Sequence, residues 1–213
     1  INRPNTPYVG LFGYVSEGKI SNTNLLNIDF IGYNYTGGVV GYGNPATIEY
    51  SSVKGGVVEG TRLSTGGLVG RIRLNSSINT CFANVNVTGD GSVGGLVGFN
   101  SSTIENSKAL GDVSGNYRIG GFVGWNNSKK ITRSTASGNV NGSSEVGGFA
   151  GSNGSDGSSP TIIQSSYSTG SVDGSENVGG LVGENWIDGE INQSFATGDV
   201  NGTTDVGGLI GIN

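Results

Sequence analysis

The side chains that most enzymes use for acid–base chemistry are scarce in this chain. Its 213 residues include no histidine and one cysteine, Cys81. Without histidine, a Ser–His pair and a zinc site of the usual His type are excluded. Asp112 and Asp199 share one position of a repeat described below, but Asn139 and Ser171 occupy the same position in other copies. We interpret this position as a solvated edge and expect no catalytic residue, metal or cofactor.

Nine Asn-x-Ser/Thr sequons offer sites for covalent modification. One of them, Asn100, lies at a repeat position where we expect a packed asparagine column, which leaves little room for a glycan. The other eight are candidate N-glycosylation sites if the protein is extracellular: Asn34, Asn75, Asn86, Asn126, Asn141, Asn153, Asn192 and Asn201.

The amino-acid composition limits the possible fold classes and binding partners of the protein. Glycine accounts for 42 residues, apolar residues for 33% and charged residues for 13%. This much glycine with so few helix formers argues against helical folds, and its spacing excludes collagen. A net charge of −5 argues against nucleic acid and anionic membranes as partners. No apolar run is long enough for a transmembrane helix, and Ile1 resembles a mature or trimmed start.

A short motif recurs eight times and determines the predicted architecture. Its second glycines lie 26 to 32 residues apart. The copies are Val9-Gly10-Leu11-Phe12-Gly13, Gly37-Gly38-Val39-Val40-Gly41, Gly66-Gly67-Leu68-Val69-Gly70, Gly94-Gly95-Leu96-Val97-Gly98, Gly120-Gly121-Phe122-Val123-Gly124, Gly147-Gly148-Phe149-Ala150-Gly151, Gly179-Gly180-Leu181-Val182-Gly183 and Gly207-Gly208-Leu209-Ile210-Gly211.

Between the motifs, Ile, small-residue and Val positions recur with the alternation of strands, as in Ile104, Ser107, Ala109 and Val113. A unit of about 28 residues cannot bury its own apolar face and must stack on its neighbours. We predict an all-β parallel β-solenoid of about seven coils, each with roughly three short strands. A propeller is rejected because its blades need about 40–45 residues. One domain covers 1–213, with irregular coils over 1–65 and regular coils over 66–213.

Two columns of the repeat predict particular packing. Cys81 stands where other coils have serine, so we expect a buried substitute for serine rather than a reactive thiol. Asn100, Asn126, Asn153, Asn185 and Asn213 follow the motif at one fixed distance, which favours a ladder of stacked amides. The first coils depart from the ladder, with Ile72 at this position.

The adjacent apolar columns of the motif predict an inner and an outer face. The first, which we call the Leu column, holds Leu11, Val39, Leu68, Leu96, Phe122, Phe149, Leu181 and Leu209. The second column holds the residue that follows each of these. Arg71 and Glu184 lie two residues beyond the second column and would point the same way, where burial would be costly, so we place the Leu column inside and the second column outside. An outward apolar stripe predicts an interaction surface. Its residues are Phe12, Tyr14, Val40, Tyr42, Val69, Val97, Phe99, Val123, Trp125, Val182 and Ile210. The aromatic members could also stack sugar rings.

The repeated Gly-Gly-Leu-Val-Gly-x-Asn, followed by Ser-x-Ala-Thr-Gly-Asp-Val-Asn-Gly, resembles the GLUG motif repeat over essentially the whole chain. That resemblance implies a surface-exposed or secreted prokaryotic protein, of the kind that includes adhesins, IgA-specific metallopeptidases and other envelope proteins. It brings no catalytic residues, because in the peptidases the chemistry belongs to a separate zinc domain.

We therefore expect a non-catalytic extracellular protein that builds a filament, sheath or similar assembly. The motif at Gly207, Gly208, Leu209 and Ile210 forms a regular strand with an open edge, which predicts end-to-end pairing with another copy. Self-association, end to end and laterally, and glycans are the expected partners. The alternative is the stalk or ligand-binding segment of an adhesin, with carbohydrate as its ligand; a polysaccharide-acting enzyme is a third class that the fold permits.

Overall fold

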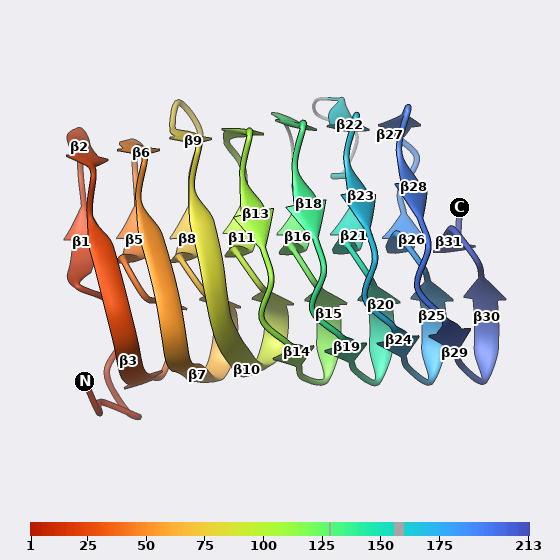
Figure 1. The fold of residues 1–213 in the computed structure, drawn as a ribbon, viewed down its shortest axis with the longest axis horizontal. Coiled ribbons are helices and arrows are strands. Elements are labelled where there is room, and N and C mark those ends of the chain that lie inside the picture. Colours follow the sequence, from red (N-terminus) through yellow and green to blue (C-terminus); the bar gives the residue numbers. More distant parts are fainter. Residues whose placement is uncertain (128, 156–159) are drawn as a thin grey trace.

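The computed structural model describes residues 1–127, 129–155 and 160–213, and within them the chain forms strands and no helix. The coils lie side by side along the long axis, with the two termini at opposite ends (Figure 1). Each coil contributes to three sheets in which neighbouring strands are parallel. The fold is the predicted parallel β-solenoid of about seven turns with a spacing near 28 residues.

The first sheet collects the strands that end each glycine motif. It contains β1 (Phe12–Val15), β5 (Val40–Gly43), β8 (Val69–Ile72), β11 (Val97–Asn100), β16 (Val123–Asn126), β21 (Ala150–Asn153), β26 (Val182–Asn185) and β31 (Ile210–Ile212). The second sheet collects the strands around the repeated isoleucine. It contains β2 (Gly18–Ser21), β6 (Ala46–Glu49), β9 (Ser77–Asn79), β12 (Thr103–Glu105), β17 (Lys129–Thr132), β22 (Thr161–Gln164) and β27 (Gly189–Asn192).

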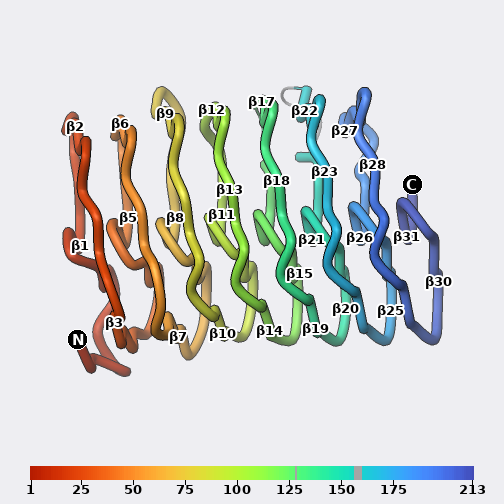
Figure 2. Tube along the Cα trace, viewed as in Figure 1, coloured from red at the N-terminus to blue at the C-terminus, as the bar shows by residue number. Residues whose placement is uncertain are grey.

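The third and largest sheet changes character along the chain (Figure 2). In the early coils it uses long strands, namely β3 (Asn24–Gly32), β7 (Ser52–Gly66) and β10 (Phe82–Gly94), with the short β4 (Thr36–Gly37). Later coils divide the same path into three pieces. These are β13 (Lys108–Ala109), β14 (Val113–Ser114), β15 (Tyr117–Gly120), β18 (Thr135–Ala136), β19 (Val140–Asn141), β20 (Ser144–Gly147), β23 (Tyr167–Ser168), β24 (Val172–Asp173), β25 (Glu176–Gly179), β28 (Phe195–Ala196), β29 (Val200–Asn201) and β30 (Thr204–Gly207).

Parallel stacking places equivalent residues of successive coils beside one another. Ile104 pairs with Ile78 and Ile131, and Ala109 pairs with Ala83 and Ala136. These isoleucine and alanine columns are buried, as their spacing predicted. Two register shifts interrupt the pairing of β7 with β10, between Asn84 and Asn86 and between Gly89 and Gly91. The apolar columns still line up on either side of them, so one buried apolar cluster runs through the stack.

The motif glycines are required by close backbone approach. A Cβ on Gly95 would clash with the Gly121 carbonyl oxygen and would lie 3.0 Å from Ala109 Cβ. A Cβ on Gly98 would lie 2.6 Å from the Thr65 nitrogen, because the motif strand packs against the backbone of β7. A side chain at Gly95 would push neighbouring coils apart, and one at Gly98 would push the motif sheet away from β7, which explains the recurrence of the Gly-Gly-x-x-Gly pattern.

The predicted outward apolar stripe is wrong for its valines. Val40, Val69, Val97, Val123 and Val182 are fully buried and belong to the same cluster as the Leu column. The prediction assumed one straight strand, but the Leu position lies in a bend before the strand begins. Alternation does not continue across that bend, so both columns face the interior. Phe99 is also buried, whereas Tyr42, Trp125 and Ile210 are partly buried and Phe12 and Tyr14 are exposed.

Candidate functional site

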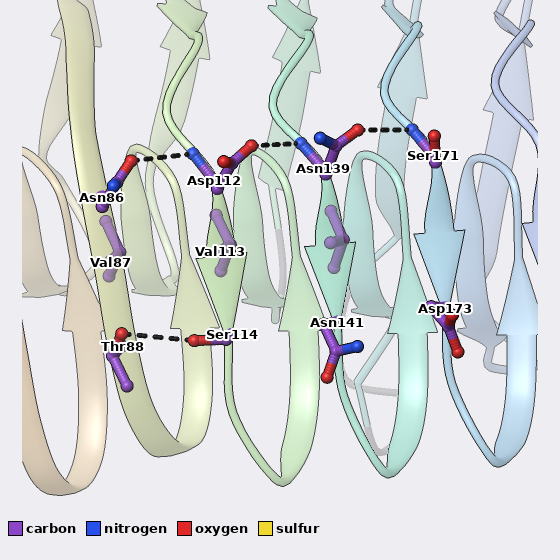
Figure 3. A pocket seen from close by; sticks show the side chains of 11 residues that line it. Asn86, Val87, Thr88, Asp112, Val113, Ser114, Asn139, Asn141, Ser171 and Asp173 are labelled. Carbon is purple, nitrogen blue, oxygen red and sulfur yellow. Dashed lines mark hydrogen bonds between the residues drawn. The ribbon is translucent and has the colours of Figure 1, made fainter.

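A groove of about 530 Å³ crosses successive coils on the outer face of the largest sheet (Figure 3). Its walls are polar side chains on and beside β10, β14, β19 and β24, above a floor that includes Val87, Val113 and Val140. The lining polar residues are Asn86, Thr88, Asp112, Ser114, Asn139, Asn141, Ser171 and Asp173. This groove contains the repeat position that the sequence placed at a solvated edge.

Side-chain oxygens in the groove bind the backbone of the next coil. The Asp112 N–H donates to Asn86 Oδ1 (3.3 Å), the Asn139 N–H to Asp112 Oδ1 (2.8 Å), and the Ser171 N–H to Asn139 Oδ1 (3.1 Å). Asp112, Asn139, Ser171 and Asp199 are all exposed, which confirms the solvated edge. In the described part of the chain, no three Cys, Asp or Glu residues gather to hold a metal ion.

The asparagine column forms the expected ladder. Nδ2 of Asn100 donates to Oδ1 of Asn126 (2.8 Å), and the same bond joins Asn126 to Asn153 and Asn153 to Asn185 (2.9 Å each). Asn185 continues it to Asn213 at 2.7 Å. Asn100, Asn126 and Asn153 have no exposed surface, so the ladder is an internal polar spine.

Two of the candidate glycosylation sites are excluded because they belong to the asparagine ladder. Asn126 and Asn153 are fully buried and both amide atoms are engaged along the column, so a glycan cannot be attached in the folded protein. Asn34 is partly buried. The five exposed candidates are Asn75, Asn86, Asn141, Asn192 and Asn201. Two of them, Asn86 and Asn141, line the polar groove.

Four aromatic members of the predicted stripe lie on strands of the motif sheet: Tyr14, Tyr42, Phe99 and Trp125. They meet side chains that come just before a glycine motif, such as Tyr35 and Arg118, and we call this row of contacts the seam. Tyr14 stacks on Tyr42 at 5.3 Å between ring centroids, and Tyr8 stacks on Tyr35 at 5.5 Å. Tyr35 and Tyr42 meet edge to face at 5.4 Å. These four rings form what we call the tyrosine cluster, and the sequence did not indicate Tyr8 or Tyr35 as members.

Arg71 extends the tyrosine cluster along the seam. Its guanidinium carbon lies 4.3 Å from the Phe99 ring centroid and 5.4 Å from that of Tyr35, and Nη1 donates to the Tyr35 hydroxyl at 3.3 Å. Phe99 in turn meets Trp125 edge to face at 5.0 Å. Tyr14, Tyr42, Phe99 and Trp125 therefore belong to an aromatic and cationic seam rather than to an apolar stripe.

Farther along the seam, carboxylate side chains join the aromatic and arginine side chains. Arg118 lies over the Trp125 ring at 4.0 Å and pairs with the buried Glu145 at 2.9 Å. Burial and the neighbouring Glu145 carboxylate raise the pKa of Glu184, which shares a hydrogen bond with Glu145; Arg118 opposes this shift. Burial and a hydrogen bond to Glu145 raise the pKa of Tyr117 to about 12.

The predicted end-to-end residues lie at the last motif strand. Gly207 pairs with Gly179, Ile210 pairs with Val182, and Leu209 is 39% exposed. The other edge of β31 is open to a further strand, whether from the same polypeptide or from another copy.

With this geometry in view, comparison with known proteins gives a family match. Three segments, 89–114, 115–141 and 174–201, match the family described as the GLUG motif. The chain carries GLUG repeats. The matched segments each contain one turn of the solenoid, and the GLUG glycines are those that bring the backbones of neighbouring coils together.

One curated relative is halomucin from Haloquadratum walsbyi, to which the chain is 40% identical over 95 residues. The match covers 44% of this chain and 1% of halomucin, so the chain spans a very small part of that relative. No solved structure matches the chain. The described residues include no helix able to cross a membrane.

Proposed function

We propose that this GLUG chain is a non-catalytic structural segment of an extracellular or cell-surface protein. The observation that carries the proposal is the continuous stack of parallel coils, which share one buried apolar cluster and, from Asn100 onward, an amide ladder. Such a stack is a stiff rod whose length grows with the number of repeats. The partial similarity to halomucin supports a surface location.

We further propose that the rods assemble into a filament or sheath. The open edge of β31, which begins at Ile210 directly after Leu209, can accept the first strand of another copy. Electron microscopy of the native material tests this proposal, with immunogold labelling to establish the location. Regular labelled filaments outside the cell are expected. Single rods would overturn the assembly, and labelling confined to the cell interior would overturn the surface role.

A pair of variants tests the strand edge in the purified chain. Leu209→Lys with Ile210→Lys should block end-to-end association, while Lys129→Ser, an exposed change on another sheet, should leave it intact. Chains that associate equally well with and without the double substitution would rule out pairing through β31.

Glycans attached to the rod are part of this proposal. They would occupy the five exposed sequons at Asn75, Asn86, Asn141, Asn192 and Asn201. Intact-mass measurement of native protein, followed by peptide mapping, should locate added mass at these residues and none at Asn126 or Asn153. A mass equal to that of the bare chain would exclude glycosylation.

A second candidate function is the ligand-binding segment of an adhesin. The tyrosine cluster favours it, because exposed aromatic rings on a rigid scaffold are suited to recognition. Single labelled rods that bind a surface ligand, in place of filaments, would favour this candidate.

A further inference from the structure

The tyrosine cluster combines ordered rings with accessible surface. Its four rings, Tyr8, Tyr14, Tyr35 and Tyr42, hold one another through two stacked and three edge-to-face contacts at 5.3 to 5.9 Å. Tyr14 is 52% exposed and Tyr8 is 43% exposed. Because the rings are already fixed by their neighbours, a ligand that contacts them orders few side chains on binding.

Arg71 adds a positive charge to this surface. Its side chain lies between Phe99 and Tyr35, and its Nε is buried without a hydrogen-bond partner. Among the described residues, no carboxylate forms an ion pair with it. Arg118 in the same seam shows the contrast, because it is satisfied by Glu145. A guanidinium that lies beside aromatic rings without a carboxylate partner can bind a carboxylate or sulfate through its remaining N–H donors.

Charge and tyrosine are distributed unevenly along the solenoid. Residues 1–74 carry six Lys or Arg and four Asp or Glu, a net charge of +2. The remaining residues carry five and twelve, a net charge of −7. Six of the eight tyrosines fall within the first 50 residues. The early coils are therefore a locally cationic, tyrosine-rich surface on an acidic rod.

We propose that the tyrosine cluster and Arg71 bind an acidic polysaccharide. Sugar rings would contact the exposed tyrosines, whose hydroxyls offer donors and acceptors to sugar hydroxyls, and an acidic group on the sugar would bind Arg71. An acidic polysaccharide fits because it supplies both the hydroxyl-bearing rings and the negative charge. This inference deepens the adhesin candidate and does not depend on filament assembly.

Titration calorimetry with the whole chain tests the proposal. The probes are a uronate oligosaccharide and its carboxyl-reduced, neutral form of the same length. The uronate form should bind, the neutral form should bind on the order of tenfold more weakly, and added salt should weaken only the former. Absence of uronate binding, or equal binding of the two forms, would overturn the proposal. Binding of polyglutamate as tight as that of the uronate would show a general anion surface and would also overturn it.

Variants locate the site. Tyr14→Ala should weaken uronate binding about tenfold, and Arg71→Gln should abolish the preference for the charged form. Arg71→Lys keeps the charge without the planar guanidinium, so part of the preference for the charged form should remain.

Tyr167→Ala and Arg133→Gln are matched controls, because Tyr167 is a stacked surface ring and Arg133 is an exposed, paired arginine elsewhere on the rod. Thermal melts identify any variant that fails to fold. Unchanged affinity in folded Tyr14→Ala and Arg71→Gln would overturn the assignment, whereas electron microscopy of native material would still test the structural role separately.

Discussion

At the scale of single residues, a column of serines shows how each coil is fastened to the next. The Ser107 hydroxyl donates to the Glu105 carbonyl (2.8 Å) and accepts from the Cys81 N–H (3.1 Å). Ser134 and Ser166 repeat the arrangement in the following coils. Cys81 takes the same place with its thiol directed at the Asn79 carbonyl (3.4 Å), as expected for a substitute for serine.

The thiol of Cys81 should be inert in the folded protein. Burial raises its pKa from 9.0 to about 11, and thiolate is the reactive form. A maleimide should therefore label Cys81 only after unfolding; labelling of the native chain at the rate of an exposed thiol would contradict this.

The raised pKa of Cys81 also means that stability is lost as pH rises from 9 towards 11, because the unfolded chain releases the thiol proton first. Cys81→Ser should remove that loss.

The Glu145–Glu184 pair predicts a pH effect at lower pH. Burial, then the charge and hydrogen bond of Glu145, raise the pKa of Glu184 above its ordinary 4.5. The folded protein holds this proton more tightly than the unfolded chain, so stability falls as pH rises through the raised pKa. Glu184→Gln should remove that fall. Melting curves over the acidic range should diverge from the parent as pH rises, whereas the exposed Glu176→Gln should follow the parent. Parallel curves for Glu184→Gln would contradict the prediction.

At the scale of elements, packing between the strands leaves little space for larger side chains. Ala109 on β13 is fully buried and faces Gly95 of the adjacent motif. Ala109→Leu should overpack this contact and destabilise the fold by about 1–3 kcal/mol. Chemical denaturation measures the change, with Lys108→Leu on the exposed side of the same strand as the control. Equal stability of the Ala109→Leu variant and the parent would place Ala109 outside the core.

The amide ladder should contribute more than its hydrogen bonds alone. Asn126→Ala leaves the buried Oδ1 of Asn153 without its donor and removes the acceptor of Asn100. A buried group left unsatisfied costs about 1–3 kcal/mol, so the melting temperature should fall. Asn141→Ala, an exposed asparagine outside the ladder, should change stability by less than about 0.5 kcal/mol. Similar losses from the two variants would show that the ladder has no special role.

The repeat predicts the strands and the columns because parallel stacking places equal residues on equal positions. It could not predict the burial of Val97, because the bend at Leu96 changes which side of the chain faces inward. It also could not predict left-handed backbone at Tyr35, Arg118 and Glu145. The residue type varies freely at that repeat position, so no composition signal marks it, yet this position brings Tyr35 to Tyr42 and Arg118 to Trp125.

At the scale of the whole molecule, stability should be a sum of coil and interface contributions. Each coil touches its two neighbours through the same three sheets, so the rod tolerates a change in the number of coils if the register is kept. The matched segment 89–114 is one such unit, since Thr88 pairs with Ser114 and a joint from Thr88 to Gly115 preserves every column.

Deleting residues 89–114 should therefore give a shorter, folded solenoid. The apolar cluster and the ladder from Asn126 onward remain continuous, so circular dichroism should retain its β signal, and cooperative unfolding should occur at a lower temperature, because one coil and its contacts are lost. Deleting only 89–101 is the control, because half a coil shifts strands onto the wrong sheet and exposes apolar columns to water. If the two deletions unfold alike, the coils do not act as interchangeable units, and the stability of the rod then depends on particular contacts within 89–114.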